Sequence, residues 1–483
     1  MGSALFARKT LEELQSQAGD THGLRRALGP WDLVALGIGA IIGAGLFSLT
    51  GIAAAENAGP AIVLSFALAA VGCAFAGMCY SEFATMIPIA GSAYTYAYAT
   101  MGEFIAWVIG WDLVLEYAVG AATVSISWSR YVVSLAHTWG IDLPAQLIAS
   151  PWQSVQLPDG TEVHGIINLP AVLVVVLISI LLMTGIRESA TVNTVVVTIK
   201  VAVVIVFIAA GWAFIQPANH QPFIPANTGT FGEFGWSGIL AGAGTIFFAY
   251  IGFDAVSTAA QEAREPQRTM PIGIIGSLVI CTVLYVTFAY VMTGLVHYTQ
   301  FRGHAAPAAL AIAATPYTWL RSAVNLAIIA GLTSVILVML LGQSRVFFSM
   351  SRDGLLPRIF SDIHPKWRTP WRSNFLFMLF VSVFSAFVPI SVVGHMTSIG
   401  TLFAFVIVCA GVLVMRKTQP GVPRPFRTPM VPLVPVLGII VCLAMMFGLG
   451  WSNWARLLVW LVIGLLIYFG YSRRHSKVLA RTS

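Results

Sequence analysis

The chain is a succession of long apolar runs separated by short polar segments. Most runs hold about 20 residues, enough for a helix to cross the ~30 Å hydrocarbon core of a bilayer. The pattern therefore predicts an all-α integral membrane protein with twelve transmembrane helices. Their expected spans are 31–53, 60–86, 101–134, 166–185, 189–214, 236–261, 271–297, 320–350, 372–389, 392–415, 429–448 and 452–471.

Two of these spans are interrupted by glycine. The first contains Gly37, Gly39, Gly43 and Gly45 between Leu36 and Phe47; the other is the run from Ala241 to Asp254. Glycine in a helix interior costs about 1 kcal/mol, and a broken helix survives in a membrane only where its backbone lines a cavity or is buried in protein. Two broken helices indicate a solute site near the midplane. Alternatively, these glycines only allow close helix packing.

The two interrupted spans open two halves of similar length. The first half, 31–214, holds spans one to five, and the second, 236–415, holds spans six to ten. Because five is odd, the second half enters the membrane from the opposite side, and any structural repeat is inverted. Two extra C-terminal helices follow at 429–471, between a polar N-terminal segment, 1–30, and a C-terminal tail, 472–483.

Composition and charge exclude several classes of protein. The chain is 58% hydrophobic and 9% charged, against about 25% charged in an average soluble domain. Most Lys and Arg residues fall on one side of the predicted topology, which places both termini in the cytoplasm. The other side carries only Arg130, Arg302, Arg321 and Arg456. Topology thus explains the net charge of +7, and no nucleic-acid partner is needed.

Motifs for enzymatic or metal chemistry are missing from the sequence. No G-x-x-x-x-G-K-[ST] motif occurs, so direct ATP-driven transport is disfavoured. The five cysteines lie in apolar runs without metal-site spacing. We therefore expect no cofactor, no metal and no catalytic residue. The segment Pro88–Tyr98 alternates aromatic and small residues, which fits either a short interfacial or re-entrant segment on the cytoplasmic side or a plain loop with interfacial aromatics.

Lys200 is the most informative charge, because it lies in the middle of the fifth span. An ionisable group inside a membrane is costly and usually functional. Burial disfavours the charged ammonium, which would let Lys200 exchange a proton during a transport cycle. The alternative is a fixed structural ammonium that never titrates.

Two carboxylates join Lys200 as candidates. Glu116 follows Asp112 by four residues on the third span, so both lie on one helix face, and Asp254 closes the second interrupted run. We expect Glu116 to take part in proton coupling and Asp254 to lie near the substrate, where it would take a proton or neutralise a cationic side chain. Alternatively, both are fixed hydrogen-bond partners for unwound backbone or for Lys200.

Several motifs resemble one transporter family. They are Gly37–Gly45, Phe247–Asp254, Glu265–Pro271 and Ser351–Pro357. Together they are similar to the amino acid–polyamine–organocation (APC) superfamily, and most to the bacterial members of its cationic amino acid transporter branch. The resemblance extends over about residues 30–475. It implies a 5+5 inverted-repeat (LeuT-like) fold with discontinuous helices 1 and 6.

The resemblance also implies roles for the interrupted segments. The first would receive the substrate carboxylate and the second its ammonium. The residues carried over are Ile42, Gly43, Ala44 and Gly45 for the carboxylate, and the carbonyls of Phe247, Phe248, Ala249 and Ile251 for the ammonium. Relatives often carry a hydroxyl residue where this chain has Ala44, so one contact to the carboxylate would be missing.

Two further implications concern coupling and selectivity. In sodium-coupled relatives of this fold a sodium ion bridges the first and eighth helices, and Lys200 resembles a covalent substitute for that ion. On the eighth span, Met339 and Leu340 would limit the size of the substrate. Their bulk argues for a smaller cavity and small neutral amino acids such as alanine.

The sequence therefore predicts a secondary active amino acid transporter of the inner (plasma) membrane. We expect proton-coupled, sodium-independent uptake of cationic or small neutral L-amino acids by alternating access. The alternatives are an amino acid/polyamine exchanger and an amino acid-binding membrane sensor. The expected partners are the amino acid, protons and the lipid bilayer. The sequence does not determine the substrate, the oligomeric state or whether a small accessory transmembrane subunit binds.

Overall fold

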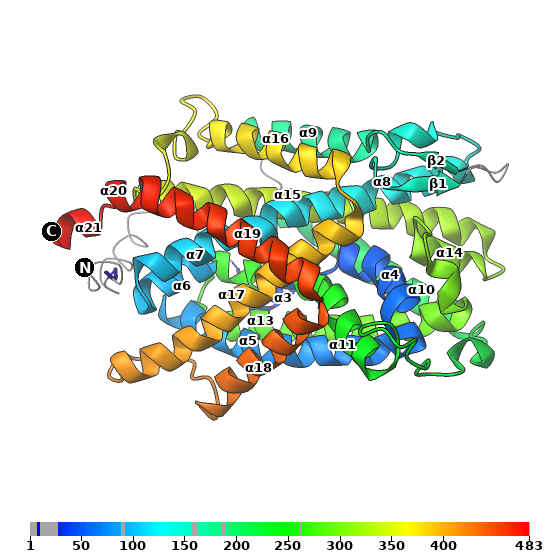
Figure 1. Ribbon diagram of the computed structural model, residues 1–483, viewed down its shortest axis with the longest axis horizontal. Helices are drawn as coiled ribbons and strands as arrows, with labels where there is room; N and C mark the ends of the chain where they lie inside the picture. The colour runs from blue at the N-terminus through cyan, green and yellow to red at the C-terminus, as the bar shows by residue number, and fades with distance from the viewer. Residues whose placement is uncertain are drawn as a thin grey trace.

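Helices dominate the structure and run mostly along one long axis (Figure 1). The computed structural model describes residues 7–9, 28–87, 92–156, 162–185, 190–260 and 263–482. Apolar runs of this length form helices because a helix satisfies all backbone hydrogen bonds within its own segment. The predicted all-helical class is therefore confirmed for the described residues, apart from one short hairpin.

The helices of the first half follow the predicted spans closely. They are α3 (Pro30–Ile41), α4 (Thr50–Ala53), α5 (Ile62–Met86), α6 (Ser92–Thr100), α7 (Glu103–Val114), α8 (Gly120–Thr138), α9 (Leu169–Met183) and α10 (Ala190–Trp212). Three π-helical turns lie among them, η1 (Gly45–Leu49), η2 (Ala54–Ala58) and η4 (Leu115–Val119). Pro30 in the first turn of α3 and the Asn168 side chain, which caps α9 at Ala171 N, fix two of the starts.

The remaining helices complete the chain. They are α11 (Gly235–Ile246), α12 (Ala255–Thr258), α13 (Pro266–Leu295), α14 (Pro307–Ala313), α15 (Thr318–Arg352), α16 (Trp371–Phe387), α17 (Ile390–Thr418), α18 (Leu433–Gly448), α19 (Trp451–Ile467), α20 (Arg473–His475) and α21 (Leu479–Thr482). The start predicted at 271 is wrong, because Pro266 occupies the first turn of α13 and Pro271 lies inside the helix.

A small antiparallel hairpin is the part of the fold that the hydrophobic pattern does not predict. Strands β1 (Ser154–Gln156) and β2 (Glu162–His164) pair with Ser154 opposite His164. Three residues per strand are too few for an alternating pattern to be recognised. The hairpin lies at the end of the molecule opposite to α20 and α21 (Figure 1).

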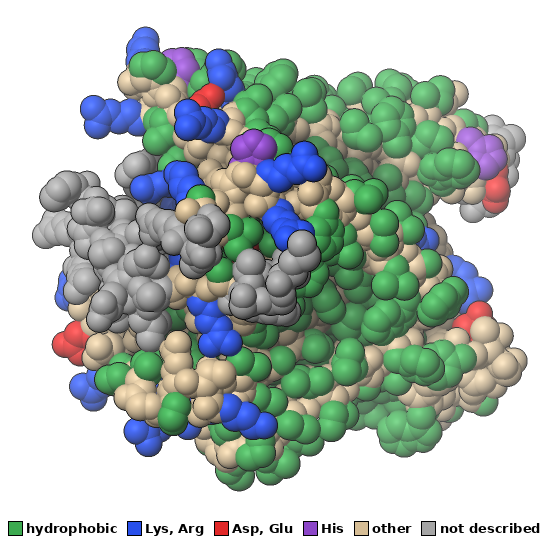
Figure 2. Space-filling view, turned by 60° about the vertical axis from the view of Figure 1, so that its left-hand side comes forward, with side chains coloured by type: hydrophobic (Ala, Val, Ile, Leu, Met, Phe, Trp, Pro, Cys, Tyr) green, Lys and Arg blue, Asp and Glu red, His purple; other side chains and the backbone are tan. Residues whose placement is uncertain are grey.

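The described residues contain eight helical stretches that are long and apolar enough to cross a membrane, together with four shorter apolar helices. In Figure 2 a broad hydrophobic surface adjoins an end of the molecule where Lys and Arg gather. An apolar belt next to a charged end is typical of a protein that is embedded in a bilayer. The molecule is a multi-pass membrane protein.

Helix α6 bears on one of the alternatives that the sequence leaves open. All nine of its residues, Ser92–Thr100, are buried, and α6 packs against α7 and α17. A buried helix favours the re-entrant interpretation over a plain surface loop. Residues 88–91 of the predicted segment lie outside the described residues.

Candidate functional site

The first interrupted segment is a true break between two helices. Helix α3 ends at Ile41, and Ile42 is extended, with φ −70° and ψ 105°. The π-helix η1 begins at Gly45. A break of this kind releases the last carbonyls of α3 and the first N–H groups of η1 from intrahelical bonding.

The second interrupted segment is broken as well. Helix α11 passes into a 3₁₀ turn, η7 (Phe247–Tyr250), and Ile251 is extended, with φ −62° and ψ 135°. Gly252 follows with φ +117°, a conformation that residues with a Cβ rarely adopt. Helix α12 then begins at Ala255. The two breaks predicted from glycine are therefore both present.

The two breaks contact each other twice, in a reciprocal way. A Cβ added to Gly45 would lie 2.2 Å from Ala249 Cα, and one added to Gly252 would lie 2.8 Å from the carbonyl carbon of Ala40. Gly45 follows the first break and contacts Ala249, which precedes the extended residue of the second. Gly252 follows that extended residue and contacts Ala40, which precedes the first break. The backbones thus cross at a distance that only glycine allows.

The carbonyls at the end of α3 are bonded by side chains from two other helices. Lys200 Nζ on α10 donates to Gly39 O at 2.6 Å, and Tyr285 OH on α13 donates to Ile41 O at 2.9 Å. A cation at a helix C-terminus also interacts favourably with the helix dipole. Lys200 is only 1% exposed, so its ammonium is held inside the protein by the backbone that the break releases.

The stem of Lys200 lies against the helix that corresponds to the eighth predicted span. A Cβ on Gly331 of α15 would lie 3.0 Å from Lys200 Cγ and 3.1 Å from its Cε. Lys200 therefore sits between α3 and α15, which are the first and eighth apolar segments of the predicted order.

After the first break, at the start of η1, several backbone N–H groups lack acceptors. Within the described part of the chain no acceptor bonds the N–H groups of Gly43, Ala44 or Gly45. All of these residues, like Ile42, are buried. Unpaired N–H groups at the start of a helix are suited to bind an anion such as a carboxylate.

The predicted acids lie together. Glu116 belongs to the π-helix η4 and Asp254 precedes α12; both are buried, and their carboxyl groups interact with each other. Tyr117 OH donates to Asp254 Oδ2 at 2.9 Å, and Thr401 on α17 contacts Glu116. Two neighbouring buried carboxyl groups repel each other when both are ionised, so such a pair is suited to hold a proton.

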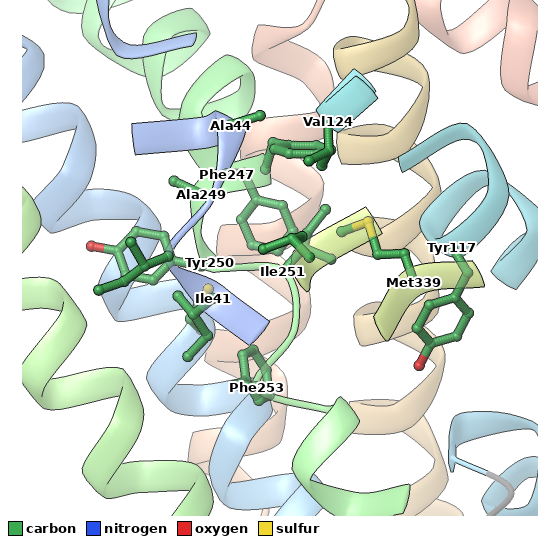
Figure 3. Packing of buried hydrophobic residues seen from close by; sticks show 14 of the residues in the cluster. Ile41, Ala44, Tyr117, Val124, Phe247, Ala249, Tyr250, Ile251, Phe253 and Met339 are labelled. Atoms are coloured by element: carbon green, nitrogen blue, oxygen red, sulfur yellow. The ribbon is translucent and has the colours of Figure 1, made fainter. Parts of the chain in front are cut away.

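Apolar side chains from three parts of the chain surround the second break. Figure 3 shows Phe247, Ile251, Val124 of α8 and Met339 of α15 directed toward one common region. Met339 and Leu340 are 5% and 3% exposed. The predicted filter residue Met339 therefore lies beside the break, whereas Leu340 is placed only as a buried residue of α15.

Three tyrosines form hydrogen bonds near the breaks that the sequence does not predict. Tyr285 bonds the end of α3, Tyr117 bonds Asp254, and Tyr131 OH donates to Phe47 O at 2.5 Å, just past the first break. A tyrosine in a transmembrane run gives no sequence signal that separates such a bond from ordinary packing.

A comparison with protein families decides the identity of the chain. The family model described as amino acid permease matches residues 28–469. The chain belongs to the amino acid permease family, within the APC superfamily. The proteins of this family are transporters rather than enzymes, in agreement with the prediction.

Individual relatives match this permease along its length. It is 44% identical to the branched-chain amino acid permease BcaP of Bacillus subtilis, over 99% of this chain and 100% of that protein. It is 40% identical to the methylthioribose transporter of Bacillus subtilis, over 98% of this chain and 99% of that protein. A vacuolar cationic amino acid transporter 4 of Arabidopsis thaliana is 35% identical, over 87% of this chain and 68% of its own length.

Proposed function

We propose that this permease is a secondary active, proton-coupled and sodium-independent transporter that takes up L-amino acids by alternating access. In this proposal twelve segments cross the inner membrane, residues 31–214 and 236–415 form inverted repeats, and 429–471 adds two helices. The reciprocal contacts of the two breaks support the inverted relation, because each glycine follows the extended residue of its own break.

The substrate's common part would bind between the two breaks. The unpaired N–H groups of residues 43–45 would bind the carboxylate, and the carbonyls of Phe247, Phe248, Ala249 and Ile251 would bind the ammonium. The support is chemical: a helix start offers donors and partial positive charge, whereas an unwound segment offers acceptors. The pair matches both ends of an α-amino acid.

The observation that carries the coupling proposal is the bond from Lys200 Nζ to Gly39 O at 2.6 Å. The ammonium occupies a position between α3 and α15, so it ties the first broken helix to its neighbours while it is charged. Loss of its proton would remove that charge and weaken the tie. The Glu116–Asp254 pair, beside the second break, offers a second place to hold a proton.

The side chain of the substrate would meet an apolar wall. Phe247, Ile251 and Met339 favour neutral aliphatic side chains over cationic ones. BcaP of Bacillus subtilis, named as a branched-chain amino acid permease, aligns over 99% of this chain. We therefore propose leucine, isoleucine and valine as first candidates, ahead of alanine and arginine.

The test is uptake into proteoliposomes that contain the purified full-length protein. Radiolabelled leucine, alanine, arginine and methylthioribose are offered under an inward proton gradient and then under a sodium gradient. The expected result is leucine accumulation driven by protons and unaffected by sodium. Uptake that requires an amino acid inside the vesicles and responds to neither gradient would instead indicate an exchanger, and binding without transport would indicate a sensor.

Lys200→Met tests the coupling residue, because methionine keeps much of the apolar stem and removes the charge. We expect gradient-driven accumulation to disappear while leucine equilibrates or exchanges at best. Lys417→Met, at an exposed lysine near the end of α17, is the matched control and should behave as the parent. Full proton-driven accumulation by Lys200→Met would refute the role of Lys200.

A further inference from the structure

Helices α9 and α16 share an apolar face that is exposed on the surface of the molecule. The two helices pack against each other and lie side by side at one edge of the molecule (Figure 1). Their exposed residues are Leu169, Leu173, Leu177 and Ile180 on α9, and Phe375, Leu376, Leu379, Val383 and Phe387 on α16. Spacings of three or four residues place each set on one side of its helix. In a multi-pass membrane protein such a face contacts lipid.

The chain that leads into α16 forms an ordered loop at one end of this face. Thr369 Oγ1 donates to the carbonyl of Met183, the last residue of α9, at 2.7 Å. The backbone N–H of Arg368 donates to His364 O at 2.9 Å, and His364 N donates to Thr369 O at 2.9 Å. These bonds close residues 364–369 into a compact turn. The turn is therefore fixed to the end of α9, next to the exposed apolar face.

Aromatic rings join this turn to the start of α16. The rings of His364 and Trp367 stack with their centroids 4.2 Å apart, and Trp371 packs edge-on against His364 at 6.0 Å. The guanidinium of Arg372 lies 5.4 Å from the centroid of the Trp371 ring. Tryptophan is enriched at the headgroup level of a bilayer, because its ring is apolar and its N–H is polar. A turn between the ends of two lipid-facing helices lies at that level.

Two cationic side chains of the turn are available to a ligand. Lys366 and Arg368 are exposed, and among the described residues no acid forms an ion pair with either of them. Arg372, in contrast, donates to Asp362 at 2.7 Å, so this acid neutralises Arg372 and leaves the charges of the turn uncompensated. Lys366 and Arg368 flank Trp367, whose side chain is exposed as well.

We propose that Lys366, Trp367 and Arg368 form a binding site for the headgroup of an anionic phospholipid. The lipid phosphate lies between the two cations, because Lys and Arg bind phosphate through charge-assisted hydrogen bonds. The acyl chains lie along the exposed face of α9 and α16. A lipid is favoured over a free anion because the cations adjoin an apolar face, and only a lipid matches both parts.

The test measures lipid binding and needs no transport, so its failure is distinct from failure of the proposed function. The thermal unfolding temperature of the purified full-length protein in a neutral detergent is recorded while dioleoyl phosphatidylglycerol, dioleoyl phosphatidylcholine or sodium phosphate is titrated. The variant is the double substitution Lys366→Gln and Arg368→Gln, at two exposed positions where folding is not at risk.

The matched control is the double substitution Lys417→Gln and Lys477→Gln, which removes the same number of charges. Both lysines are exposed. Lys417 lies near the end of α17, which is described over its whole length and exposes no large apolar residue. Lys477 lies in the C-terminal tail, between α20 and α21. A general effect of net charge on lipid binding would therefore appear in the control to the same extent.

We expect phosphatidylglycerol to raise the unfolding temperature saturably in the parent and in the control. In the Lys366/Arg368 variant the half-saturating concentration should rise about 25-fold, because each basic residue near an anionic lipid surface contributes a factor of about five. Equal responses of all three proteins to phosphatidylglycerol would overturn the proposal.

The other two titrants separate the remaining explanations. A response of the parent to phosphatidylcholine equal to its response to phosphatidylglycerol would overturn the proposal, because the apolar face would then bind lipid without regard to charge. An equal response to sodium phosphate would overturn it by showing a site for free anions. A second copy of the chain that covers α9 and α16 would exclude lipid, and the absence of any response to phosphatidylglycerol would overturn the proposal in that case.

Discussion

Gly45 and Gly252 matter because they have no side chain. Each permits an approach of two backbones that a single methyl group would prevent, and Gly252 also holds φ at +117°. The free-energy penalty of glycine in a transmembrane run is therefore offset by the contact between the two breaks. In the proposed binding mode, this contact positions the polar groups that would bind the substrate.

We predict that Gly45→Ala destabilises the protein and impairs transport. Overpacking of a tight interior contact costs about 1–3 kcal/mol, and the displaced atoms include the backbone of Ala249. Thermal unfolding in detergent and leucine uptake are the measurements. Gly470→Ala is the control, because nothing lies within 4 Å of the added methyl. Parent-like unfolding of Gly45→Ala would contradict the contact.

Individual residues differ in how far the sequence reveals their roles. The glycine runs predict both breaks, and the depth of Lys200 predicts its burial. The acceptor of Lys200, Gly39 O, has no signature of its own, because any residue has a carbonyl. Tyr285 and Tyr131 escape prediction for a related reason: their hydroxyls bond backbone atoms that only the break makes available.

At the scale of elements, the end of α15 gathers several chain segments. Asp353 follows α15 and accepts from Lys9 Nζ at 2.5 Å and from Tyr94 OH of α6 at 2.6 Å. Its backbone carbonyl accepts from Lys477 N at 3.1 Å. Residues near both ends of the chain are thus fastened to α6 and α15.

We predict that Asp353→Asn loosens this junction. The ion pair with Lys9 is largely buried, and a charged hydrogen bond of this kind contributes about 1.5–3 kcal/mol. Hydrogen exchange of the backbone amides in residues 7–9 should become faster, because the Asp353 side chain holds Lys9, and the unfolding temperature should fall.

Asp362→Asn provides the comparison for that variant, because the Asp362–Arg372 pair is about half exposed and exposed pairs contribute little. Similar exchange rates for residues 7–9 in both variants would show that the Asp353 side chain does not hold this segment in place.

In this fold the presence of helices is easier to predict from the sequence than the irregular turns within them. Long apolar runs fix the helices, since a bilayer tolerates few other structures. The π-helical turns η1 and η4 are not predictable in the same way, because one additional residue in a turn leaves the apolar composition unchanged. Yet η4 contains Glu116, so the orientation of a candidate acid depends on a feature that periodicity does not reveal.

At the scale of the whole molecule, charge is distributed unequally between the two ends. Lys and Arg gather at the end that carries α20 and α21 (Figure 2), and this asymmetry predicts that end to be cytoplasmic. The hairpin end would then face outward.

Cysteine labelling in whole cells tests this orientation. The five native cysteines are buried, so a membrane-impermeant maleimide should give little background. We predict that Asp142→Cys, at an exposed site after α8, is labelled in intact cells. Lys366→Cys, exposed between α15 and α16, should be labelled only after permeabilisation. The reverse pattern would invert the proposed topology.

The reciprocal contact of Gly45 with Ala249 and of Gly252 with Ala40 has a consequence for how selectivity can evolve. Two backbones in direct contact cannot be adjusted one at a time, because a shift of either displaces the other. In the proposed binding mode, affinity for the carboxylate and affinity for the ammonium are therefore inherited together. Specialisation for a new amino acid must come from substitutions on α8 and α15, such as at Val124 or Met339, which border the breaks without holding them together.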